Sequence, residues 1–168
     1  RFNFPNQLIF TEPYDKSRTP VVLVHGLLST PMMWGNLVRS LEADPEIRRR
    51  YQFWVFFYPT GWPIPLSAAQ LRRSLADADK RYHYKELVLV GHSMGGILSR
   101  IQVTDSNGRG VLADVVGDRA AASLERRMPG QGKLKDAMFF KPNPKVEKVI
   151  FICTPHRGSN LALIGPAG

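Results

Sequence analysis

Residues 91–95 read Gly-His-Ser-Met-Gly and place one serine between two glycines. They follow an apolar run at 87–90 and precede a segment, 96–101, that can continue as a helix. A sharp strand-to-helix turn raises the serine hydroxyl above a sheet, and flanking glycines let the turn pass close to its neighbours. A plain Gly-Ser-Gly turn would not explain why strand, turn and helix occur in register. The pattern predicts that Ser93 is a nucleophile.

A second motif, Val-His-Gly-Leu-Leu at residues 24–28, begins at the end of another apolar run. When a serine attacks an ester, the carbonyl oxygen becomes an anion, which two fixed backbone N–H groups stabilise. We predict that Met94, directly after the serine, supplies one N–H group and that Leu27 supplies the other. Gly26 would let this loop approach the substrate. We expect His25 to support the loop through hydrogen bonds to the backbone, not to act as the base.

Elements of an α/β fold surround both motifs. Four short apolar runs, typical of strands buried on both faces, lie at 21–24, 53–57, 87–90 and 149–152. Helical periodicity between them predicts one helix that starts at Thr30 and Pro31, and a second that starts at Ser67. The alternation predicts a mostly parallel sheet with helices on both faces.

The stretch from 105 to 145 is long for a connection, which predicts an insertion within a single domain spanning 1–168. Two interpretations stay open. The insertion is either a lid, a partly amphipathic cover over the site, or a surface excursion with a short helix packed on the sheet edge.

Together, Val-His-Gly-Leu-Leu and the run Gly-His-Ser-Met-Gly-Gly at 91–96 resemble the α/β-hydrolase fold, and specifically bacterial lipases and carboxylesterases. The stretch 154–159 also looks like the segment that follows the next strand in such lipases, and the resemblance extends over about 21–160. It implies a serine hydrolase that cleaves carboxylic esters, small or lipid, through an acyl-serine intermediate. Such an enzyme of lipid degradation would need no cofactor and no metal.

The chain departs from this family after His156, because no Asp, Glu or His follows it. The family order is Ser, then Asp or Glu, then His. We therefore expect the last two strands of the sheet to be absent, the catalytic acid and histidine to lie outside this sequence, and the chain to form about two thirds of the domain. The open apolar sheet edge would then associate with the remaining part or with another chain.

An internal triad is the alternative. It would join Ser93 and His156 to one of four acids in the insertion, Asp105, Asp114, Asp118 or Asp136. We disfavour it because an orienting carboxylate must be held rigidly.

We expect no catalytic role for the other histidines or for the cysteine. We expect His83 to be exposed, His92 to pack beside the serine, and Cys153 to be a small core residue. Residues 59–65 and the pair 32–33 would follow strands on the side of the oxyanion loop. They would either line an acyl pocket or pack as ordinary loops.

Composition narrows the function classes further. The chain has 168 residues, of which 43% are hydrophobic and 22% charged, as expected for an ordinary globular domain. No apolar run reaches the ~18 residues of a transmembrane helix. The net charge is +9, yet the basic runs at 48–50 and 126–127 accompany no nucleic-acid motif, so we interpret them as solvated faces. A secreted or periplasmic location is favoured over a cytoplasmic one.

Three function classes stay open from the sequence alone. An amidase or acyltransferase uses the same serine turn, and a non-catalytic binding protein can retain the same fold. Reactivity of Ser93 distinguishes the enzymes from the binding protein.

Overall fold

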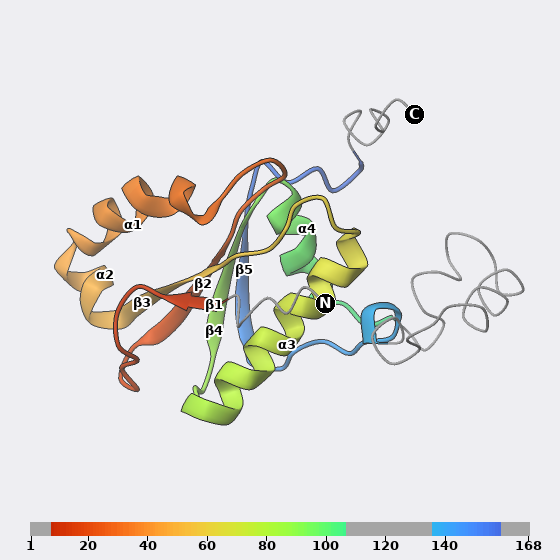
Figure 1. Ribbon diagram of the computed structural model, residues 1–168. Helices are drawn as coiled ribbons and strands as arrows, with labels where there is room; N and C mark the ends of the chain where they lie inside the picture. The colour runs from red at the N-terminus through yellow and green to blue at the C-terminus, as the bar shows by residue number, and fades with distance from the viewer. Residues whose placement is uncertain (1–7, 107–135, 159–168) are drawn as a thin grey trace, which may run out of the picture.

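The computed structural model describes residues 8–106 and 136–158, and these residues form a five-stranded sheet between two helical layers (Figure 1). The strands are β1 (Leu8–Phe10), β2 (Thr19–Val24), β3 (Tyr51–Phe56), β4 (Leu87–His92) and β5 (Val146–Ile152). Their order is β1-β3-β2-β4-β5, and only β1 runs antiparallel to its neighbour. The predicted α/β class with a mostly parallel sheet is confirmed.

Helices cover both faces of the sheet, as predicted. They are the 3₁₀ helix η1 (Pro31–Trp34), α1 (Gly35–Glu42), α2 (Pro45–Arg50), α3 (Ile64–Tyr82) and α4 (Met94–Ile101). In Figure 1, α1 and α2 lie on one side of the strands, and α3 and α4 lie on the other.

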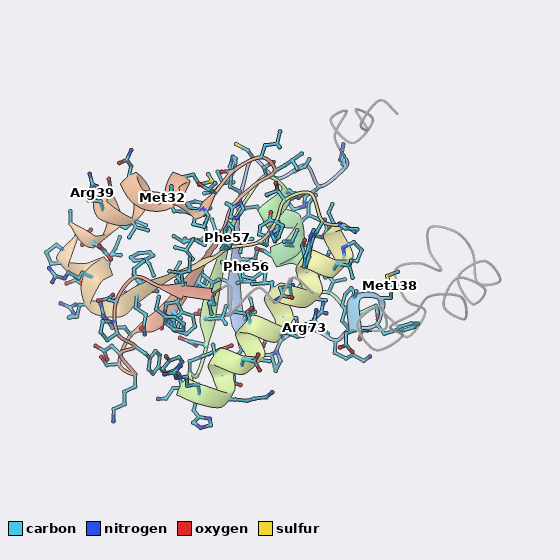
Figure 2. All side chains as sticks on the ribbon, viewed as in Figure 1. Met32, Arg39, Phe56, Phe57, Arg73 and Met138 are labelled. Carbon is cyan, nitrogen blue, oxygen red and sulfur yellow. The ribbon has the colours of Figure 1, made fainter. Side chains whose placement is uncertain are left out.

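The core is divided between these two faces because successive side chains of a strand alternate. In β2, Val22 and Val24 face the cluster formed with α3 and α4, whereas Val21 and Leu23 face the cluster under η1 and α1. These four side chains are at most 7% exposed. Figure 2 labels Phe56, the last residue of β3, in the first of these clusters. Burial on both faces explains why the central strands are continuous apolar runs.

Two helix starts differ from the prediction. Residues 31–34 form a 3₁₀ helix before α1 begins at Gly35, although Thr30 is the N-cap as predicted. The second helix, α3, starts at Ile64, with a proline in its first turn, and Ser67 is buried inside the helix. The fixed φ angle of proline suits the first turn of a helix. The helix therefore begins near the proline, three residues before the position that the capping pattern at Ser67 predicts.

The sequence reading missed β1 and α2. The short strand β1 pairs with β3 over only three residues, too few for a pattern to emerge. The start of α2 did carry a signal, because Asp44 precedes Pro45 and its carboxylate accepts from the backbone N–H of Glu46 at 2.8 Å. The arginines at 48–50 occupy the last turn of α2 and are exposed, as a solvated face requires.

The expectation that every apolar run is buried on both faces is wrong for β5. This strand lies at the edge of the described sheet, and Ile150 and Phe151 are 49% and 40% exposed. Cys153 was expected in the core but is exposed, because it follows the end of β5 and has a positive φ of 50°. An edge strand with one neighbour leaves part of its side chains uncovered.

Most of the predicted insertion, including Asp114 and Asp118, lies outside the described residues. The described ends of that stretch meet: Ser106 donates its backbone N–H to the Phe140 carbonyl at 3.1 Å, and Lys141 pairs with Asp105 at 2.8 Å. Across the ranges 8–106 and 136–158, no helix has the length and apolarity to span a membrane.

Candidate active site

Ser93 occupies the tight turn between β4 and α4. Its backbone has φ 53° and ψ −121°, a conformation that a residue with a side chain rarely adopts. The Ser93 N–H donates to the Ile152 carbonyl at 2.9 Å, which ties the turn to the end of β5. Strained backbone of this kind costs about 1–3 kcal/mol and persists where the surrounding structure enforces it.

Glycines let the elements around this turn approach each other. A Cβ atom on Gly91 would collide with the backbone of Gly96, one turn into α4. A Cβ on Gly96 would in turn overlap the side chain of Thr154, which follows β5. The three segments that meet at Ser93 are therefore packed at backbone distance, and this packing holds the serine in its unusual conformation.

The loop after β2 passes directly beside Ser93. A Cβ atom on the buried Gly26 would lie 3.0 Å from the Ser93 Cβ and 3.0 Å from the His92 Nδ1. The structure thus brings together the two motifs that the sequence separates by more than sixty positions. His92 packs under Gly26, as expected for a packing residue, and its Nδ1 is buried.

The backbone N–H groups of Leu27 and Met94 have no hydrogen-bond partner among residues 8–106 and 136–158. Met94 is the first residue of α4, so its N–H has no acceptor within the helix. Leu27 has no hydrogen-bond partner for its N–H among the residues that the structure describes, whereas the N–H of the next residue, Leu28, is bonded to Thr60 Oγ1. The role of Leu27 and Met94 as oxyanion donors stays a prediction.

His25 is fully buried behind this loop. Its Nδ1 lies 3.1 Å from the Gly26 carbonyl oxygen, and since a carbonyl only accepts, Nδ1 carries the hydrogen. The imidazole stacks on the Tyr58 ring, with centroids 4.5 Å apart and 20° between the planes. Burial lowers the pKa of His25, which keeps the ring neutral. These contacts match the expected supporting role of this histidine.

The burial of His25 predicts acid sensitivity. Because its folded pKa lies below the unfolded value of about 6.5, the unfolded chain takes up a proton first as the pH falls. The stabilising contribution is complete above about pH 6.5 and declines as the pH falls toward the folded pKa. We expect chemical denaturation to show a lower free energy of unfolding at pH 5.5 than at pH 7.5. The variant His83→Gln, at an exposed site, should keep this slope, and His25→Gln should flatten it.

His156 makes its described side-chain contacts with residues other than Ser93. Its Nδ1 is 3.2 Å from a guanidinium nitrogen of Arg100, and its ring packs edge-on against Phe151. Among residues 8–106 and 136–158, no hydrogen bond joins His156 to Ser93.

The described acids of the alternative triad also lie elsewhere. Asp105 pairs with Lys141, and the backbone carbonyl of Asp136 accepts from Arg72 at 3.0 Å. No described carboxylate is hydrogen-bonded to His156. The geometry thus does not assemble an internal triad from residues 8–106 and 136–158.

The structure also shows where the remaining candidate residues from the sequence lie. His83 is exposed and ends α3 in a left-handed conformation, and no cluster of metal-ligating side chains occurs within the described ranges. Met32, in η1, is 84% exposed, and Trp62, in the loop that follows β3, is 38% exposed. Figure 2 shows Met32 on the same side of the sheet as α1. The sequence analysis missed Tyr58, which follows the last residue of β3 by two positions.

Comparison with known proteins decides the family. The sequence model described as the alpha/beta hydrolase family matches residues 21–154, which include both motifs. The chain belongs to the alpha/beta hydrolase family. A search of curated protein sequences found no significant match to this chain.

Solved structures show the same fold. The mature form of the Bacillus licheniformis lipase BlEst2 aligns with a TM-score of 0.58 and 20% identity, over 98% of this chain and 55% of that one. The propeptide form of the same lipase aligns with a TM-score of 0.52 and 20% identity, over 92% of this chain and 26% of that one. This alpha/beta hydrolase family member therefore spans about half the length of the mature lipase.

Proposed function

We propose that this chain carries the nucleophile and oxyanion site of a carboxylic ester hydrolase of the lipase or esterase type. The observation that supports this most is the contact between the two motifs. Ser93 stands in a strained turn, and the loop bearing Gly26 and Leu27 runs so close to it that a Cβ on Gly26 would lie 3.0 Å from the Ser93 Cβ. A nucleophile beside two free N–H groups fits acyl transfer.

The proposed reaction begins with attack of Ser93 Oγ on the ester carbonyl carbon. A bond forms between Oγ and carbon, the carbonyl π electrons move to oxygen, and the hydroxyl proton passes to a base. The N–H groups of Leu27 and Met94 stabilise the oxyanion. As the tetrahedral intermediate collapses, the alcohol leaves with a proton from the protonated base, and water later releases the acid from the acyl-serine. We assign no base or carboxylate among residues 8–106 and 136–158.

The substrate side of the site is apolar. Leu28, in the loop that carries Leu27, is 92% exposed, and Met32, in the helix η1 that follows this loop, is 84% exposed. The segment 57–62, which also follows a strand at the same sheet end, adds Phe57 and Trp62, 39% and 38% exposed. These side chains favour an acyl group of hydrocarbon character over a charged one.

The full-length protein tests this proposal directly. We expect it to hydrolyse p-nitrophenyl esters of short and medium acyl chains, and to hydrolyse the matching p-nitroanilides far more slowly. Preferential cleavage of the anilides would indicate an amidase, and ester transfer to an added alcohol in place of hydrolysis would indicate an acyltransferase. Absence of all three activities in a folded full-length protein would favour a binding protein.

A further inference from the structure

We propose that Tyr58 and Thr60, on the segment after β3, are positioning residues that hold the loop from His25 to Leu28 beside Ser93. This inference rests on the proposed function, in which Leu27 supplies an oxyanion N–H group. It adds two side chains that neither motif contains.

Tyr58 anchors the first residue of the loop. Its side chain is 1% exposed, and its hydroxyl donates to the His25 carbonyl at 2.8 Å. The ring also stacks on the His25 imidazole. Burial raises the pKa of Tyr58, so the hydroxyl keeps its hydrogen and donates throughout the working pH range of an enzyme. A buried hydrogen bond to a carbonyl fixes that peptide plane, and with it the direction of the chain that follows.

Thr60 anchors the last residue of the loop. Its Oγ1 accepts the Leu28 N–H at 3.3 Å, and Leu28 has a positive φ of 54°, which a leucine rarely adopts. The bond also occupies the N–H of Leu28, which is then not available to a substrate oxygen. The proposed donor is the N–H of the preceding residue, Leu27.

Between these two anchors, Gly26 lies against the Ser93 Cβ. The loop is therefore held at both ends by one segment and in the middle by the serine turn. An oxyanion donor acts only when it is already aimed at the developing charge, and a displacement of about 1 Å costs on the order of 100-fold in rate. Loss of an anchor should lower kcat more than it raises KM, because the donor matters most in the transition state.

The first experiment compares two buried tyrosines in the full-length protein. Tyr58→Phe removes only the hydroxyl, and we expect kcat for a p-nitrophenyl ester to fall about tenfold or more while KM changes less than about threefold. Tyr84→Phe is the matched control, because Tyr84 is 2% exposed and its hydroxyl donates to the Leu75 carbonyl at 3.0 Å, away from the loop. It should lose similar stability and keep its kcat. Equal losses of kcat in both variants, or none in either, would overturn the proposal.

A second pair of variants avoids the risk that a core substitution prevents folding. Thr60 is only partly buried, and Thr60→Val removes the acceptor at nearly constant volume. We expect Thr60→Val to lower kcat several-fold and Thr60→Ser to retain it. A Thr60→Ser variant as slow as Thr60→Val would indicate that packing, not the hydroxyl, is what matters.

Amide hydrogen exchange separates this inference from the proposed function. In Tyr58→Phe and Thr60→Val, the Leu28 amide should exchange faster than in the parent protein, and in Tyr84→Phe it should not. If the parent protein hydrolyses no ester, the proposed function fails, and the exchange rates still decide whether the anchors hold the loop. Unchanged Leu28 exchange in both anchor variants contradicts the anchoring itself.

Discussion

Replacing Ser93 by alanine should lower kcat for an activated ester by at least about 10³-fold in the full-length protein. The substitution removes the one oxygen that forms the acyl bond and leaves the N–H groups of Leu27 and Met94 in place. The residual rate then reflects only binding and oxyanion stabilisation. Steady-state kinetics with a p-nitrophenyl ester measures the loss.

The control for this prediction is Ser40→Ala, at an exposed position on α1. It should keep its kcat within about twofold, because surface substitutions far from a site rarely alter function. A Ser93→Ala protein that is folded and retains more than a tenth of the parent kcat would show that another group is the nucleophile.

The second large effect concerns stability. Gly95→Ala should reduce the free energy of unfolding by about 3 kcal/mol. Helix propensity alone predicts the opposite sign, because alanine favours a helix interior over glycine by up to about 1 kcal/mol. The difference arises because a Cβ on Gly95 would overlap the carbonyl oxygens of Val24 and His25. Backbone atoms at the end of a central strand have little room to move aside.

Gly35→Ala is the matched control, since a Cβ at Gly35, the first residue of α1, meets no atom within 4 Å. That variant should be unchanged or more stable by up to about 1 kcal/mol. Urea denaturation of both variants measures the contrast. A Gly95→Ala protein as stable as Gly35→Ala would mean that α4 is not packed against the end of β2 as described.

Most of the architecture could be predicted because a strand that is buried on both faces has an uninterrupted run of apolar residues. The runs at 21–24 and 87–90 are apolar without interruption, since β2 and β4 are central and covered by helices on both sides. The same rule failed at 149–152, because an apolar run does not reveal whether its strand is central or at an edge. Position in the sheet is a tertiary property, and it decides the exposure of Ile150 and Phe151.

The site divides in a similar way. The close approach of Gly26 to the Ser93 turn could be predicted because glycines occur where two backbones must touch, whereas the roles of Ser93, Met94 and Leu27 stay predictions. Tyr58 and Thr60 were not, because their contacts to His25 and Leu28 join positions more than thirty residues apart. A tyrosine or threonine after a strand has many possible partners, and only the parallel pairing of β2 with β3 brings these residues together.

The most direct test of the central claim is the site of covalent labelling by a fluorophosphonate probe in the full-length protein, located by peptide mass spectrometry. The probe phosphonylates an activated serine and thus reports nucleophile and oxyanion site together. We predict a single adduct on the peptide that contains Ser93, absent from Ser93→Ala. An adduct on a different residue, or ester turnover by a protein whose Ser93 remains unlabelled, would contradict the claim.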